Sequence, residues 1–257
     1  MFYFDRLDAH TLRPTEHVSG AWAVKDQHIA PALGLMAHEV ETDRDRRRDD
    51  GLRLSRLSYD ILGPLPMEQF TIDTKVLRPG RTIELVECTI THAGRPTVVL
   101  RAWLMSTSDT SILEGTAYPR LRAPLEMPTW DPASIWQGGF IASAQVRREQ
   151  IEPGRAQFWV NTDVPLLAEP VSPLARAAGM FDVANGLTVR VSPEEVAFPN
   201  VDLTAHLFRS PMDGWIGYDT TVSFGPQGHG LTHSTMHDEA GPFGVVSQSL
   251  TVRPLNP

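Results

Sequence analysis

VDLTAHLFR, residues 201–209, is the first of four strand-like segments that end at Arg253; the others are WIGYDTTVSF (215–224), HGLTHSTMHD (229–238) and FGVVSQSLTVR (243–253). Each segment is rich in β-branched or aromatic residues. The turn signals Ser210-Pro211, Gly225-Pro226 and Ala240-Gly241-Pro242 separate them. This part of the chain therefore predicts four antiparallel strands that follow one another as a meander.

The composition is that of an ordinary globular protein. The 257 residues are 41% hydrophobic and 21% charged, enough for one large or two small domains. A net charge of -8 argues against a nucleic-acid partner, which needs a basic face to neutralise phosphates. No apolar run approaches the roughly 18 residues of a membrane span, and the start of the chain is too short for a signal peptide. We expect a cytoplasmic protein whose single cysteine, Cys88, is a packed and reduced thiol.

The first half of the chain predicts strands around one helix. Two short strand candidates, FYFDRL (2–7) and roughly 16–22, precede a helical stripe that begins near Pro31 and ends by Glu41. The mixed charges of ETDRDRRRDD (41–50) then predict a solvated loop, with a functional patch as the alternative. The next four strands are RLSRLSYDIL (53–62), EQFTIDTKVLR (68–78), TIELVECTITH (82–92) and PTVVLRAWLM (96–105).

A proline-rich segment then divides the chain. Pro119, Pro124, Pro128 and Pro132 cannot lie in a central strand. After them the pattern restarts with strand candidates near 142–148 and 156–164. We therefore expect an N-terminal unit of residues 1–113, a linker of residues 114–138 and a C-terminal unit of residues 139–257.

The second unit contains its own predicted helix, from Pro173 to Ala184. Ser172 is a suitable cap for its start, and Asn185-Gly186 ends it. The segment is apolar nearly all round, with Arg176 and Asp182 as exceptions, so we expect it to be buried. A buried helix with a curved antiparallel sheet around it is thus predicted twice, as an internal repeat.

Two short phrases carry a family resemblance. Gln248-Ser249-Leu250 and Asp202-Leu203-Thr204 resemble the acyl-CoA thioesterase II-like family, and in particular its double-hotdog members. The resemblance implies an α+β double hotdog, in which two fused units each wrap a curved antiparallel sheet around a long central helix. THAGRPTVV (91–99) and MHDEAGPFGVV (236–246) mark the same final hairpin in each half, as expected after duplication of one ancestral unit.

The resemblance also implies a catalytic site. In this family an Asp, a Thr or Ser, and a Gln hold a water molecule against the thioester carbonyl, and Asp202, Ser223 and Gln248 match these positions. Such a set can hydrolyse an activated thioester without a covalent nucleophile. The corresponding positions of the first half fall near Arg56, Val76 and Arg101, so we expect one site, where the two halves meet.

The entrance to the first helix departs from the family pattern. Relatives often carry Gly-Gly-Gln there, whereas this chain has Lys25-Asp26-Gln27. We expect Gln27 and His28 to bind substrate. The arginines of the charged run 41–50 are candidates for contacts with coenzyme A phosphates.

The sequence lacks the residue patterns that metal sites, serine hydrolases and nucleotide-binding proteins require. His229, His233 and His237 follow one another at intervals of four residues. In a strand, consecutive histidines at this spacing lie roughly 13 Å apart, too far to share a metal ion. The sequence contains no Gly-x-Ser-x-Gly elbow and no nucleotide-binding glycine motif. We therefore expect neither a metal nor a cofactor.

The resemblance favours an enzyme that hydrolyses acyl-CoA, or a related thioester, to a free acid and a thiol. A non-catalytic protein that binds acyl-CoA or a lipid is the alternative, and an enoyl-CoA hydratase is a third reading. Association of copies through their hotdog sheets is compatible with all three.

Overall fold

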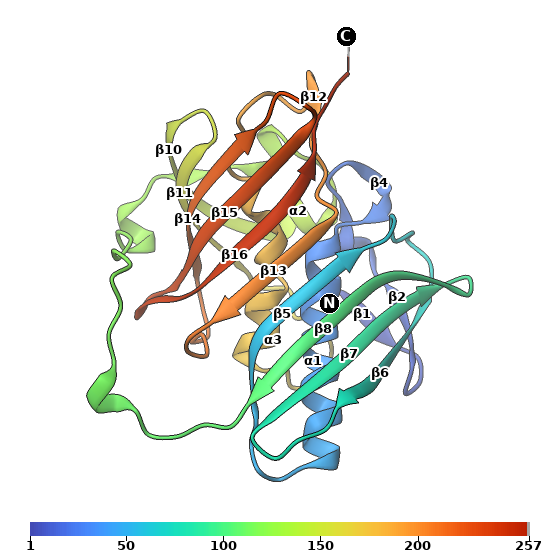
Figure 1. Cartoon of the computed structure of the whole chain (residues 1–257). Coiled ribbons are helices and arrows are strands. Elements are labelled where there is room, and N and C mark those ends of the chain that lie inside the picture. The colour runs from blue at the N-terminus through green and yellow to red at the C-terminus, as the bar shows by residue number, and fades with distance from the viewer. Residues whose placement is uncertain (256–257) are drawn as a thin grey trace.

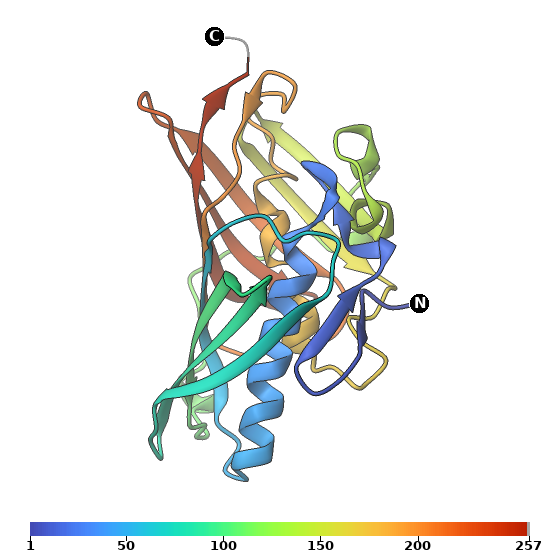
Figure 2. The same cartoon turned by 90° about the vertical axis from the view of Figure 1, so that its right-hand side faces the viewer.

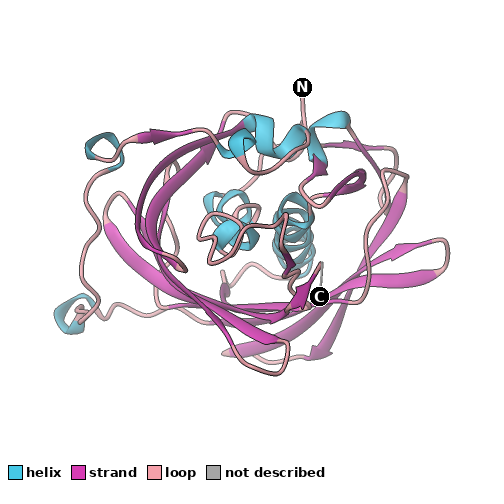
Figure 3. Cartoon of the chain, turned by 90° about the horizontal axis from the view of Figure 1, so that it is seen from above, coloured by secondary structure: helices cyan, strands magenta, loops and turns pink. Residues whose placement is uncertain are grey.

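The computed structural model describes residues 1–255, which form one 13-stranded sheet curved around two helical segments (Figures 1 and 3). The strand order is β1-β2-β6-β7-β8-β5-β13-β16-β15-β14-β11-β10-β9. Figure 2 shows the first helix lying along the concave side of the sheet. The predicted arrangement of a helix with a curved sheet around it, present twice, is confirmed.

The first half supplies the strands on one side of the sheet. They surround helix α1 (Ile29–Arg47) and are β1 (Phe4–Arg6), β2 (Thr11–Pro14), β5 (Arg53–Ile61), β6 (Phe70–Arg78), β7 (Ile83–His92) and β8 (Arg95–Met105). The four long strands lie where the alternating patterns predict them. Of the expected strand at 16–22, only β3 (Ser19–Gly20) is extended, because η1 (Glu16–Val18) is a 3-10 turn; β3 pairs with β4 (Ala23–Gln27).

The second half repeats the arrangement of the first. Its helical segment consists of α3 (Pro173–Ala178) and the 3-10 turn η5 (Phe181–Ala184). The long strands are β10 (Ala144–Glu152), β11 (Arg155–Thr162), β13 (Asp202–Leu207), β14 (Ile216–Phe224), β15 (His229–Asp238) and β16 (Gly241–Thr251). Short elements complete the half: β9 (Thr129–Trp130), α2 (Gly139–Ser143), β12 (Val196–Ala197) and β17 (Arg253–Pro254).

The prediction of a simple meander in the last four strands is wrong. Strands β14, β15 and β16 do form a meander, but β13 pairs with β16 and not with β14. The other edge of β13 pairs with β5 of the first half, and β5 likewise pairs with β8. In each half, the first long strand after the helical segment thus lies at the centre of the molecule, where both of its edges find hydrogen-bond partners.

Helix α1 extends six residues beyond its predicted end at Glu41. Most of the charged run 41–50 is therefore helical and not a loop. The side chains of Arg47 and Arg48 pair with Glu84, which is 1% exposed, and together they lower its pKa although burial opposes this. Basic side chains in the last turn also complement the helix dipole. Arg44, Arg47 and Arg48 are thus paired within the protein, whereas Arg46 is exposed; contact of this run with coenzyme A phosphates stays a prediction.

The second helix is interrupted. Ser172 caps α3 as predicted, because its Oγ accepts a hydrogen bond from the Ala175 N–H at 3.0 Å. Gly179 then ends the α-helix, and the backbone continues as η5. At this break α3 touches α1 backbone to backbone: a Cβ on Gly34 would lie 2.7 Å from the Gly179 Cα. Apart from the exposed Pro173 and Arg176, the segment is buried, as its composition predicts.

The proline-rich segment runs over the outer face of the second half of the sheet (Figure 1). The carbonyl oxygen of Pro119 lies 3.0 Å from His237 Nε2, and that of Arg122 accepts a hydrogen bond from Trp159 Nε1 at 2.8 Å. The segment therefore covers His237, whereas His229 and His233 are exposed. Within residues 1–255, no helix has the length and apolar character needed to cross a membrane.

Candidate functional site

A cavity of about 560 Å³ lies between the two halves. Its walls come from the N-terminus of α1, from α2 and η5, and from the segment that precedes β13. Most of the lining is apolar. Its polar and aromatic lining residues include Gln27, His28, Phe140, Asp182, Asn185 and Asn200.

Asp182 is a buried carboxyl group in the wall of this cavity. Its Oδ1 accepts hydrogen bonds from Asn200 Nδ2 at 2.7 Å and from Gln248 Nε2 at 3.0 Å. Burial raises the pKa of Asp182 to about 7, although the two amide donors act in the opposite direction. The carboxyl group therefore changes its charge near neutral pH, as a general base must.

Three different elements position these groups. Asp182 lies in η5, and Asn200 comes just before β13, where it also donates to the Asp202 carbonyl oxygen at 3.2 Å. Gln248 projects from the inner face of β16 and donates additionally to the Asp182 carbonyl oxygen at 3.3 Å. Asp182 and Asn200 line the cavity, and Gln248 supports Asp182 from the sheet.

His28 faces Asp182 across the cavity as the N-cap of α1. Its Nδ1 accepts a hydrogen bond from the Ala30 N–H at 3.2 Å and lies 4.0 Å from Asp182 Oδ2. Its ring packs against Phe140, with 4.3 Å between the ring centroids. Burial lowers the pKa of His28 to about 3, so the imidazole is neutral. Since Nδ1 is an acceptor, the ring hydrogen is on Nε2.

Gln27 precedes His28 and lines the same cavity. Its Nε2 donates to the Pro66 carbonyl oxygen at 2.7 Å, whereas its buried Oε1 has no partner among residues 1–255. The N-terminus of α1 also contributes the positive end of a helix dipole. The structure thus brings Gln27, His28 and Asp182 to one cavity; that the first two bind substrate stays a prediction.

The structure does not assemble the predicted set of Asp202, Ser223 and Gln248. Asp202 lies on the outer face of β13, where its Oδ1 accepts a hydrogen bond from the Ser249 N–H at 2.6 Å and completes the pairing of two strands. Ser223 is exposed on the outer face of β14. Because strand residues alternate between faces, neither side chain shares the inner face with Gln248.

Asp182 is the carboxyl group that the sequence reasoning missed. The sequence does contain a signal, since Asp182 is one of two charged residues in a segment that is otherwise apolar and buried. A carboxylate in such a place needs hydrogen-bond donors, and Gln248 and Asn200 provide them. Asn200 precedes the Asp202-Leu203-Thr204 phrase by two residues and has no signal of its own.

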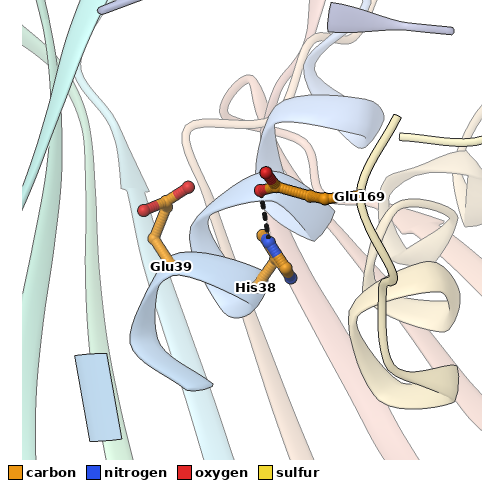
Figure 4. A group of neighbouring side chains, drawn as sticks. All are labelled: His38, Glu39 and Glu169. Carbon is orange, nitrogen blue, oxygen red and sulfur yellow. Dashed lines mark hydrogen bonds and ion pairs between the residues drawn. The ribbon is translucent and has the colours of Figure 1, made fainter. Parts of the chain in front are cut away.

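A second group of ionisable side chains lies outside the cavity (Figure 4). His38 Nε2 is 2.9 Å from Glu169 Oε1, and Glu39 lies nearby. The guanidinium of Arg6 pairs with both Glu39 and Glu169. Because Arg6 already supplies the positive charge that a metal ion would bring, this group is an ion-pair network that links β1, α1 and the loop after β11.

Comparison with known protein families decides the relationship. A family model described as the acyl-CoA thioesterase N-terminal domain matches residues 18–105, and one described as the C-terminal domain matches residues 119–252. The chain belongs to the acyl-CoA thioesterase family. The resemblance seen in the sequence is thereby confirmed, and membership indicates thioester hydrolysis as the general activity.

Solved structures agree with the fold of this acyl-CoA thioesterase family member. An acyl-CoA thioesterase II, TesB2, from Mycobacterium marinum is 17% identical, with a TM-score of 0.69 over 98% of this chain and 96% of that chain. A hot dog fold protein of unknown function from Alicyclobacillus acidocaldarius is 13% identical, with a TM-score of 0.74 over 96% and 95%. The double hotdog fold is confirmed. A search of curated proteins found no match.

Proposed function

We propose that this protein hydrolyses acyl-CoA thioesters and that Asp182 is the general base. One observation carries the proposal: a buried carboxyl group with a pKa of about 7 lies in the wall of an apolar cavity between the two halves. Two amide donors occupy its Oδ1, so Oδ2 remains as the acceptor for a water proton. The family membership supports the same chemistry.

The reaction follows from this arrangement. Asp182 Oδ2 takes a proton from water as the water oxygen bonds to the thioester carbonyl carbon. The tetrahedral intermediate then collapses, the carbon–sulfur bond breaks, and Asp182 returns its proton to the departing thiolate. A free acid and a thiol are formed, and the Asp182 carboxylate is regenerated.

The developing oxyanion needs hydrogen-bond donors. The backbone N–H groups of Gln27 and His28 already donate to the carbonyl oxygens of Leu65 and Val18, respectively. The Ile29 N–H at the N-terminus of α1 therefore remains as a donor to the oxyanion. Asn185 is a second donor in our proposal, because residues three apart in a 3-10 turn share a face and Asp182 lines the cavity. Its Oδ1 accepts from the Gly186 N–H at 2.7 Å, so its NH2 group is available.

The acyl group binds in the apolar part of the cavity, in our proposal. Buried side chains of α2, β10, β11 and the segment after η5 form this part: Phe140, Val146, Val160 and Leu187. Each methylene that enters an apolar pocket contributes about 0.8 kcal/mol. The specificity constant should therefore rise with acyl length until the cavity is full.

Thiol release from a panel of acyl-CoA thioesters, from short to long chains, tests the proposal. Asp182→Asn keeps the hydrogen-bond acceptor but removes the base, so kcat should fall by at least about a hundredfold. Asp202→Asn is the matched control, since an amide oxygen can still accept from Ser249, and it should keep full activity.

Full activity of Asp182→Asn would refute the proposed base. A wild-type protein that binds acyl-CoA without releasing thiol would instead be the non-catalytic acyl-CoA-binding protein.

A further inference from the structure

Thr232 and Gln248 lie directly opposite each other in the pairing of β15 with β16. Both side chains project from the inner face of the sheet and are fully buried. Thr232 Oγ1 and Gln248 Oε1 have no hydrogen-bond partner among residues 1–255. A buried hydroxyl and a buried amide oxygen without partners each carry a desolvation cost, so two such atoms in opposed positions of one sheet point to an interaction between them.

The amide of Gln248 has a fixed orientation. Its Nε2 donates to Asp182 Oδ1 at 3.0 Å, which directs Oε1 away from that carboxyl oxygen. Oε1 therefore needs a donor within the sheet. Side chains in directly opposed positions have Cβ atoms about 5 Å apart, so a rotation of the Thr232 hydroxyl, or one buried water, spans the gap.

Other hydroxyl groups on this face are already engaged. Ser234, the next inward residue of β15, forms a hydrogen bond of 2.7 Å with Thr220 of β14. Val246 and Leu250, the inward neighbours of Gln248 on β16, have no hydroxyl group. Thr232 is thus the hydroxyl donor that the sheet places opposite Gln248.

We propose that Thr232 is a positioning residue for the general base, because its hydroxyl donates toward Gln248 Oε1, directly or through one buried water, and keeps the Gln248 amide turned toward Asp182. This role rests on the proposed function of Asp182. Without the hydroxyl, the amide can flip and present its oxygen to the carboxylate. The ionised form of Asp182 then loses a donor and becomes less favourable.

The pH profile of kcat/KM tests this role. Thr232→Val preserves shape and removes the hydroxyl, and Thr232→Ser keeps the hydroxyl and serves as the control. In Thr232→Val the acid limb of the kcat/KM profile should move to higher pH by about half to one pH unit. On that limb kcat/KM should therefore fall about three- to tenfold, whereas at high pH it should change little. Thr232→Ser should follow the wild-type profile.

Thermal denaturation tests the contact without reference to activity. The variants are Thr232→Val, Gln248→Met and the double mutant. If the two side chains interact, the losses in Tm should be clearly non-additive, and Thr232→Val alone should lower Tm. Additive changes, or a higher Tm in Thr232→Val, would show that the hydroxyl has no partner and would overturn the inference.

Coupled Tm changes together with an unmoved acid limb would leave Thr232 a structural role only, which also overturns the inference. The Asp182→Asn variant separates this failure from that of the proposed function. If it is inactive while Thr232→Val keeps the wild-type profile, the general base stands and the positioning role falls. If Asp182→Asn is fully active, both fall.

Discussion

At the scale of single residues, Asp182 determines both the proposed chemistry and a stability cost. The folded protein keeps the Asp182 proton up to about pH 7, whereas a carboxyl group in the unfolded chain releases it near 3.8. Between these values the folded state binds more protons, so the free energy of unfolding falls as pH rises. Above pH 7 the full destabilisation by the ionised Asp182 carboxylate is present.

Asp182→Asn should therefore be more stable than the wild type, by an amount that grows from pH 4 to pH 7 and then remains constant. The difference of about three units corresponds to up to about 4 kcal/mol, because one pKa unit is about 1.4 kcal/mol. Denaturant unfolding of both proteins across this pH range measures it. A difference that does not change with pH would contradict the buried, protonated carboxyl group.

Ser223 provides a second test at this scale. Its side chain is exposed on the outer face of β14, away from the cavity. Ser223→Ala and Ser223→Thr should both retain activity within about twofold, because the side chain does not line the cavity and a surface substitution rarely changes the free energy of unfolding by more than about 0.5 kcal/mol. A loss of tenfold or more in Ser223→Ala, measured by thiol release, would return Ser223 to the site and reject the assignment to Asp182.

At the scale of elements, the contact between α1 and α3 holds the two halves of the site together. The Ser172 Oγ caps α3 through the Ala175 N–H and donates to Glu41 of α1. The same hydroxyl therefore satisfies a helix end and a buried carboxylate. The helices touch backbone to backbone at Gly34 and Gly179; η5, which follows this contact, places Asp182 Oδ2 4.0 Å from His28 Nδ1.

Ser172→Ala should lower the free energy of unfolding by about 1–2 kcal/mol, the usual cost of a lost N-cap. The m-value should stay unchanged, because the unfolded surface is the same. Urea unfolding measures both quantities, with Ser106→Ala at an exposed position as the control. Equal stability of the two variants would show that the cap contributes nothing.

At the scale of the whole molecule, the pairing of β5 with β13 joins the two halves into one sheet. The cavity also takes walls from both halves. Neither half therefore has a complete core or a complete site. The hydrogen bonds between β5 and β13 join the two halves, whereas the linker runs over the outside of the sheet.

The protein should unfold in a single cooperative transition, because separating the halves would expose two central strand edges and the cavity walls. Calorimetry of the full chain measures this. Residues 1–113 expressed alone should aggregate, for the same reason. Two resolved transitions, or a soluble and folded half, would show that the halves are independent units.

The sequence alone determined the positions of the long strands, the cap at Ser172, the burial of the second helix and the repeat of one unit, because alternation, capping and apolar composition are local properties. It also predicted the strand in which Gln248 lies. Tertiary structure decided which carboxyl group meets Gln248. Asp202 and Ser223 lie in strands as predicted, but the strand order and the alternation of faces turn both outward, whereas the break after Gly179 turns Asp182 into the cavity. Contacts between residues 18 and 66 positions apart cannot be read from local patterns, since they depend on how the whole sheet closes around the helices.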